Sequence, residues 1–147
     1  MIRRWLRRRP DDRGSAAIEA AILAPPLLVL IGLAIVGGRI QVAGGAIEGA
    51  AHDAARAASI SRTASEAQTN ALAAAGATLN QGGLHCTSLT VAVNTSGFGV
   101  PVGEPATVSA TVTCVVDFSD LVADGLPGSK TLTASFVSAL DSFRTRI

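Results

Sequence analysis

Residues 14–38 read GSAAIEAAILAPPLLVLIGLAIVGG, and the 19 residues from Ala20 to Gly38 carry no charge. A helix rises about 1.5 Å per residue, so this run spans roughly 28 Å, close to the apolar thickness of a bilayer, about 30 Å. The sequence therefore predicts a membrane span at about residues 20–38. One acid, Glu19, lies at the edge of the span, five positions after Gly14.

The charges of the chain are distributed unevenly about this span. Six arginines and two aspartates precede Ser15, whereas six basic and nine acidic residues follow from there to the C-terminus. Basic residues beside an apolar span tend to stay in the cytoplasm, so we expect a single-pass protein of the cell membrane with its N-terminus inside. Apart from Trp5 the arginines lack interleaved aromatics, which argues against nucleic acid as a partner. We interpret residues 1–14 as a basic cytoplasmic leader.

The helical pattern continues beyond the membrane. Apolar and small residues recur at three- and four-residue spacing as far as Ala58, with charged residues on other faces of the helix. A continuous helix from Ala16 to about Ala58 is roughly 65 Å long. Pro25-Pro26 removes backbone donors within the span, so we expect a kink or local unwinding there. Small residues four apart let helices approach closely, although the abundance of alanine accounts for them equally well.

The rest of the chain, residues 61–147, predicts a small extracytoplasmic α+β domain. Thr63 and Glu66 form a capping-box pattern before a second helix, about Ala64 to Leu79. Two-residue alternation predicts strands at 87–93, 106–115 and 130–137, with a Gly/Pro/Ser connection at 94–105 and a helical turn at 117–123.

We therefore expect an α+β fold with a long N-terminal helix over 15–60, a second helix and a three-stranded antiparallel sheet. One face of the sheet would be covered by the outer half of the first helix or by the second helix.

Two cysteines, Cys86 and Cys114, belong to the exported part. Outside the cytoplasm a lone pair of cysteines is most simply a disulfide. Antiparallel pairing of the first two strands brings the two residues within the roughly 5.5–6 Å Cα separation that a disulfide needs. With only 3% aromatic residues, the core is thin, and a disulfide of this loop size stabilises it by about 3–4 kcal/mol in the chain-entropy model.

The sequence shows no convincing catalytic, metal or cofactor site. His52 and His85 can be drawn with the cysteines as a zinc site, but their spacing matches no common zinc pattern. Pairing of the cysteines also removes the thiol that a Cys/His nucleophile needs. The paired glycines match no phosphate-binding loop, and the aspartates lack the alternation of a calcium loop. We expect no enzyme, no metal or other cofactor and no small-molecule substrate.

The N-terminal residues resemble the TadE-like family, minor pilins or pseudopilins of tight-adherence pilus systems. The resemblance rests on four segments and a tail: Arg13 to Ala20, Leu23 to Leu28, Gly38-Arg39, Asp53 to Ala58, and Ser135 to Ser138 with Asp141, Phe143 and Arg144. Ala20 stands where family members commonly have an aromatic residue. A chain of this length with a disulfide-linked domain is also unlike the major pilin, which is usually little more than the helix.

The resemblance implies processing by a prepilin peptidase after Gly14, which makes Ser15 the new N-terminus and Glu19 the fifth mature residue. It also implies assembly with other pilin-like subunits, through the N-terminal helix and a pilus assembly platform, into a filament for adhesion or secretion. Taken alone, Glu19 is an acid tolerated at the membrane interface. With the resemblance, we favour an ion pair between Glu19 and the new amino group of a neighbouring subunit, which would also set the stagger of the subunits.

Two other classes of protein stay open at this point. In a secreted protein, residues 1–38 form a signal peptide with a mediocre cleavage site at Val42-Ala43-Gly44, although a 19-residue span is long for a signal core. In an unprocessed single-pass protein, the span only anchors a small binding domain. The mature N-terminus distinguishes the three classes, since it is Ser15 for the pilin, near Gly44 for the secreted protein and Met1 or Ile2 for the anchor.

Overall fold

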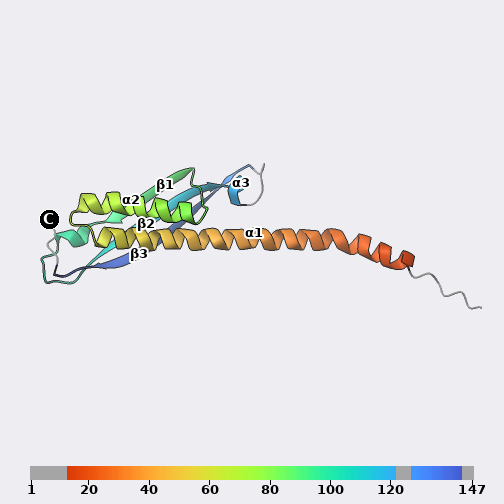
Figure 1. Ribbon diagram of the computed structural model, residues 1–147, viewed down its shortest axis with the longest axis horizontal. Coiled ribbons are helices and arrows are strands. Elements are labelled where there is room, and N and C mark those ends of the chain that lie inside the picture. The colour runs from red at the N-terminus through yellow and green to blue at the C-terminus, as the bar shows by residue number, and fades with distance from the viewer. Residues whose placement is uncertain (1–12, 122–126, 144–147) are drawn as a thin grey trace, which may run out of the picture. The chain divides into compact units, whose positions relative to one another are not determined.

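The computed structural model describes residues 13–121 and 127–143 and divides into two compact units, Met1–Ile35 and Val36–Ile147. Figure 1 shows the order of the elements along the chain. The boundary between the units falls within the first helix, α1 (Arg13–Ser59). Each unit is therefore described by itself.

The first unit contains the apolar part of α1. Its large side chains, ten residues from Ile18 to Ile35, are 48–68% exposed. A helix that is apolar on all sides and unburied suits a lipid environment. Among the described residues, α1 is the one helix long and apolar enough to cross a membrane, as the sequence predicts.

Pro25 and Pro26 lie inside α1 without interrupting it, so the expected local unwinding is wrong. Proline holds φ near −65°, which is compatible with a helix, and its cost is the loss of its own N–H donor and crowding of the preceding turn. Long transmembrane helices tolerate that loss because the rest of the backbone ladder continues on both sides.

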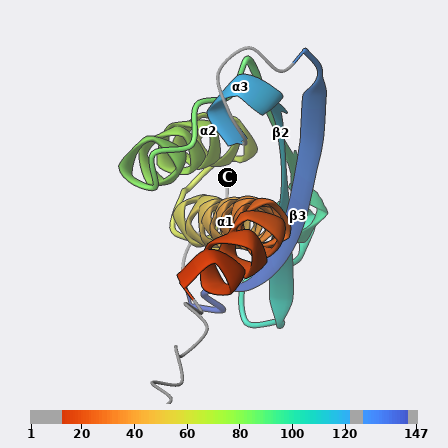
Figure 2. The ribbon, with the colours of Figure 1, turned by 90° about the vertical axis from the view of Figure 1, so that its right-hand side faces the viewer.

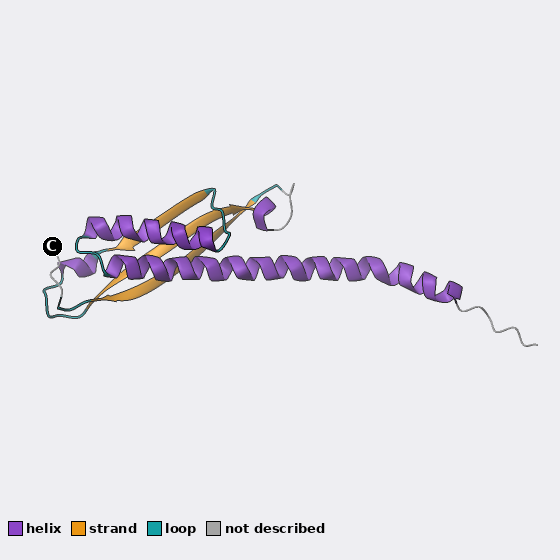
Figure 3. Cartoon of the chain, viewed as in Figure 1, coloured by secondary structure: helices purple, strands orange, loops and turns teal. Residues whose placement is uncertain are grey.

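The second unit contains a three-stranded antiparallel sheet in the order β1-β2-β3. The strands are β1 (Ser88–Asn94), β2 (Ala106–Asp117) and β3 (Ser129–Leu140), shown as arrows in Figure 3. The three predicted strands are confirmed, and the last two are longer than predicted. The reason is cross-strand pairing, because β2 and β3 stay in register over all twelve residues of each strand.

The connections between strands are short helical segments. A 3₁₀ helix, η1 (Ser96–Gly99), occupies part of the predicted Gly/Pro/Ser connection. The predicted helical turn at 117–123 is present as α3 (Phe118–Leu121), and residues 122–126 lie outside the described part of the chain.

Two helices pack on one face of the sheet. Figure 2 shows α2 (Ala64–Gln81) and α1 in a layer beside β2 and β3. The sequence analysis left open which helix covers the sheet, and in the structure both residues 36–59 of α1 and α2 do so. The expected α+β fold is confirmed.

Alanine dominates the buried helix surfaces. The fully or almost fully buried residues on the two helices are Ala43, Ile47, Ala50, Ala51, Ala54, Ala55 and Ala58 on α1, and Ala67, Ala71, Ala75 and Leu79 on α2. The opposing sheet face contributes mainly Val108, Ala110, Val112, Cys114 and Val116 from β2. Such small side chains bring the backbones close together, so this core gains its stability from close packing rather than from large buried side chains.

Both ends of α2 are closed by local hydrogen bonds. The Thr63 hydroxyl accepts from the Glu66 N–H, as the capping pattern predicts, whereas the Glu66 carboxylate accepts from the N–H of Arg62 rather than that of Thr63. At the other end Gly83 adopts a φ of +68°, which favours glycine. The Leu84 N–H then reaches the carbonyl of Leu79, and the buried side chains of these two residues complete a Schellman cap.

Cys86 and Cys114 form a disulfide, as predicted, with a Cα separation of 5.4 Å. Cys114 is fully buried on the helix-facing side of β2, directly opposite Leu89 of β1. The bond closes a loop with a sequence separation of 28 residues, for which the chain-entropy model gives about 3–4 kcal/mol. It therefore links the end of the α2–β1 connection to the central strand.

The close packing of α2 gives the first prediction. We expect Ala71→Leu to lower the free energy of unfolding of the second unit by about 1–3 kcal/mol, because three extra carbons must enter a fully packed interface. Ala73→Leu is the matched control on the exposed side of the same helix and should change stability by less than about 0.5 kcal/mol. Thermal unfolding of the two variants measures the difference, and equal stability would contradict the packing argument.

Candidate functional site

The predicted processing and assembly residues lie at the start of α1. Gly14 and Ser15 belong to its first turn, and Glu19 follows one turn later with an exposed side chain. Between Glu19 and Arg39 the helix carries no charge. The arrangement places one carboxylate at the boundary of an apolar helix surface, where a cationic partner would be desolvated with it.

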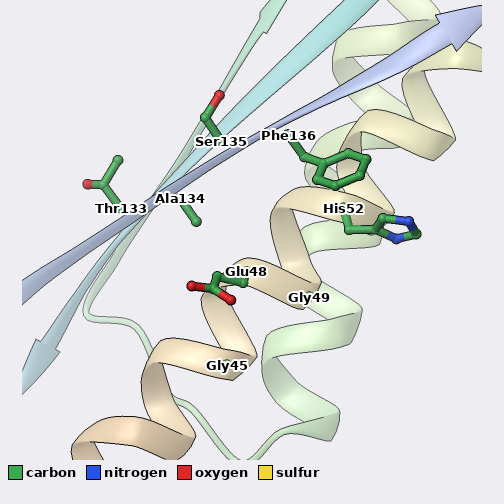
Figure 4. Close-up of a pocket in the computed structure, with 8 residues that line it drawn as sticks. All are labelled: Gly45, Glu48, Gly49, His52, Thr133, Ala134, Ser135 and Phe136. Atoms are coloured by element: carbon green, nitrogen blue, oxygen red, sulfur yellow. The ribbon is translucent and has the colours of Figure 1, made fainter.

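A second feature is a groove in the second unit with a volume of about 540 Å³, lined by Gly45, Glu48, Gly49, His52, Thr133, Ala134, Ser135 and Phe136. One wall comes from α1 and the other from β3, as Figure 4 shows. The ring of His52 meets that of Phe136 edge-on, with centroids 4.6 Å apart and planes inclined by 67°. This contact closes one end of the groove.

Asp53, next to His52, links the two helices. Its carboxylate accepts a hydrogen bond of 2.7 Å from the Thr78 hydroxyl of α2 and lies 3.3 Å from Nδ1 of His52. The Thr78 hydrogen bond is the main cause that lowers the pKa of Asp53, and the hydrogen bond to His52 adds to it. Asp53 is therefore an ionised connector between α1 and α2 at neutral pH.

The imidazole and thiol groups considered as zinc ligands are not brought together as a metal site. Both cysteines are used in the disulfide, and His85 is exposed. Among residues 13–121 and 127–143, no group of three or more His, Cys, Asp or Glu side chains is placed to hold a metal ion.

The apolar helix and its edge carboxylate match a known family. Residues 14–56 match the family model described as TadE-like protein. This match confirms the TadE-like resemblance seen in the sequence. It begins at Gly14 and ends three residues before the end of α1, so it covers the helix and leaves the sheet and disulfide outside it. No curated protein and no solved structure matches the chain.

Sequence reasoning missed the groove and the Asp53–Thr78 bond. Asp53 and Thr78 are 25 residues apart in the sequence, and the two walls of the groove are about 80 residues apart. No local sequence pattern can therefore pair them. One signal was available: Phe136 is the only aromatic residue in the β3 segment, and its even number places it on the helix-facing side with Leu132 and Ala134.

The Asp53 contact gives the second prediction. A carboxyl whose pKa is lowered by folding adds stability above its unfolded pKa and loses that contribution as the pH falls through the lower, folded pKa. We expect Thr78→Val to raise the pKa of Asp53 toward its ordinary value. The variant should therefore lose less folding stability than the parent chain as the pH falls through the acid range. NMR titration of the Asp53 carboxyl measures the shift. Thr69→Val, which removes a hydroxyl bonded to a backbone carbonyl of the same helix, should leave it unchanged.

Proposed function

We propose that this protein is a TadE-like minor pilin or pseudopilin, made as a membrane-inserted precursor and processed after Gly14. The match of residues 14–56 to the TadE-like family carries the proposal, because it starts at the expected processing residue and includes Glu19 and the apolar helix. The exposed apolar side chains of the first unit support insertion into lipid. In this role the protein takes part in building a tight-adherence pilus used for adhesion or secretion.

The chemistry of assembly depends on two charges. Removal of residues 1–14 gives Ser15 a free ammonium group at the membrane boundary. Glu19 of one subunit then pairs with that ammonium group on a neighbour. An isolated charge is unfavourable in lipid, so the two charges are most stable when they are desolvated together as a pair. This requirement selects one axial stagger between the helices of neighbouring subunits.

The proposed topology places the N-terminus in the cytoplasm and residues 61–147 outside. The arginine-rich leader supports this orientation. The Cys86–Cys114 disulfide supports it independently, because disulfides persist in oxidising compartments. The partners in this proposal are the membrane, a prepilin peptidase, an assembly platform and other pilin-like subunits. The role is structural rather than enzymatic.

A single-pass anchor with a small binding domain is the second candidate, and the groove between α1 and β3 is the observation that favours it. A secreted protein with a cleaved signal peptide is the third, although the helix that would hold the signal continues into the packed unit. These candidates differ from the pilin in their mature N-terminus.

The third prediction concerns that N-terminus. Mass spectrometry of the membrane-extracted protein should find Ser15 as the first residue when a prepilin peptidase is co-expressed and Met1 or Ile2 when it is not. Gly14→Leu should block processing, because a bulky side chain then occupies the scissile position. Gly32→Leu, where an added side chain meets open space, should be processed normally. An intact N-terminus in the native host would exclude the pilin proposal.

The fourth prediction concerns Glu19. We expect Glu19→Gln to leave processing largely intact and to lower incorporation into surface filaments by roughly tenfold, since loss of a desolvated ion pair costs more than 1 kcal/mol. Immunoblotting of sheared surface filaments against the membrane fraction measures incorporation. Glu104→Gln removes the same charge from a loop of the exported unit and serves as the control. Equal incorporation of the two variants would contradict the ion-pair role.

A further inference from the structure

The two edge strands of the sheet, β1 and β3, differ in their hydrogen-bond contacts. Along β1, the side chain of Gln68 from α2 bonds to the strand backbone at two points. Its Nε2 donates to the Val91 carbonyl at 2.6 Å, and its Oε1 accepts from the Val93 N–H at 3.2 Å. One amide group thus supplies the donor and acceptor that a neighbouring strand would supply. The part of this edge at Val91 and Val93 is already occupied.

The same contacts determine which backbone groups of β3 point away from β2. Because the Val93 N–H bonds to Gln68, the odd-numbered residues of β1 direct their backbone groups away from β2. Antiparallel ladders alternate between bonded and non-bonded pairs, so even-numbered residues of β2 must bond to β3 through the register Val112↔Ala134. The backbone groups that point outward from β3 therefore belong to Thr131, Thr133, Ser135, Val137 and Ala139.

That outer edge of β3 is long and unprotected. Within the described residues no strand pairs with it, and no side chain forms a hydrogen bond to it as Gln68 does to β1. Its twelve residues contain one charge, Lys130, and neither proline nor glycine, and their register with β2 has no bulge. Soluble proteins usually protect such an edge with charges, prolines or bulges, because it can pair with another chain.

The groove lies beside this edge. Four consecutive β3 residues, 133–136, line it, although consecutive residues of a strand point to opposite faces of the sheet. Residues of both parities therefore contribute to the groove, which runs along this part of β3. Its second wall is α1, from Gly45 to His52. A strand added at the β3 edge would thus lie beside the groove, and its helix-facing side chains would point toward it.

The chemistry of the groove selects a basic side chain. Figure 4 shows the Glu48 side chain extending from α1 toward the β3 side of the groove. Among the described residues, no hydrogen bond or ion pair of the structure involves the Glu48 carboxylate. Further along the groove, the ring of Phe136 from β3 meets the ring of His52 from α1. A lysine or arginine would pair with the carboxylate and approach the Phe136 ring. Gly45 leaves room beside it for the stem of such a side chain.

We propose that the free edge of β3 binds one extended segment of another polypeptide as a fourth strand, with a basic side chain in the groove against Glu48. Main-chain hydrogen bonds to Thr133, Ser135 and Val137 would supply affinity, and the groove would supply selectivity. This site lies wholly in the exported unit, so it stands whether or not the apolar helix enters a filament.

A second copy of the chain fits this edge poorly. Pairing of β3 with β3 about a twofold axis keeps both α1 helices on the same side of the joined sheet. Three strands cover roughly 14 Å at their usual spacing, whereas two packed helices cover about 18–20 Å. The helix layers of two copies would therefore be wider than the joined sheets, and the two Glu48 carboxylates would lie on the same side of the joined sheet. A single strand with no helix of its own avoids both conflicts.

The test uses the intact chain in detergent micelles and the synthetic peptide acetyl-TVTKTVT-amide, whose lysine lies on the same side as its valines. We expect saturable binding by fluorescence anisotropy, with slower amide hydrogen exchange at Thr133, Ser135 and Val137. The peptide with glutamate in place of lysine should bind roughly tenfold more weakly, as expected when a like charge faces a carboxylate.

Two variants locate the binding. Ser135→Pro removes an outward N–H without breaking the ladder to β2 and should weaken binding roughly tenfold or more. Thr111→Ala is its control, because it removes the 3.1 Å hydroxyl contact to Ser135 and keeps every edge N–H. Glu48→Gln should lower affinity for the lysine peptide about fivefold to tenfold and leave the glutamate peptide no weaker. Glu104→Gln should change neither affinity.

The proposal is overturned by equal affinity for the two peptides, by unchanged exchange at the three edge amides, or by Glu48→Gln binding like the parent chain. It is also overturned if sedimentation shows a dimer that Ser135→Pro dissociates, since the second copy would then be the occupant. Resistance of the cysteines to alkylation without reductant shows that each variant retains its fold.

Discussion

The second unit depends on the close approach that alanine permits. The helix surfaces that face each other and the sheet consist almost entirely of methyl groups, and the sheet offers mainly valine in return. Because the contribution of each such residue is small, stability requires many contacts at short range rather than a few large ones. The polar bonds that cross this packing, Thr78 to Asp53 and Asn70 to Ser61, require the same short distance between elements.

The disulfide compensates for what this core lacks. A chain with four phenylalanines, one tryptophan and no tyrosine buries little aromatic surface. Linking Cys86 to Cys114 limits the unfolded ensemble, and it does so at the central strand, where it also fixes the register of β1 against β2. The second unit thus combines weak but numerous apolar contacts with one covalent constraint.

The sequence predicts the elements better than their contacts. Apolar composition and three- to four-residue spacing predict α1, and two-residue alternation predicts each strand, because these patterns follow from which faces are buried. The ends of β2 and β3 differ because cross-strand pairing, rather than local alternation, decides where a hairpin stops. The Gln68 contacts and the groove between α1 and β3 join residues far apart in the chain, so they become visible only when the fold is known.

The Gln68 amide has a further consequence for how the sheet can grow. A sheet whose two edge strands are both open can add strands at either edge and build stacks of indefinite length. Here one side chain of α2 occupies the backbone of Val91 and Val93 on β1, so the proposal above leaves β3 as the edge where the sheet grows. Under that proposal the fold favours one added strand per chain and disfavours indefinite growth of this hydroxyl-rich, nearly uncharged sheet.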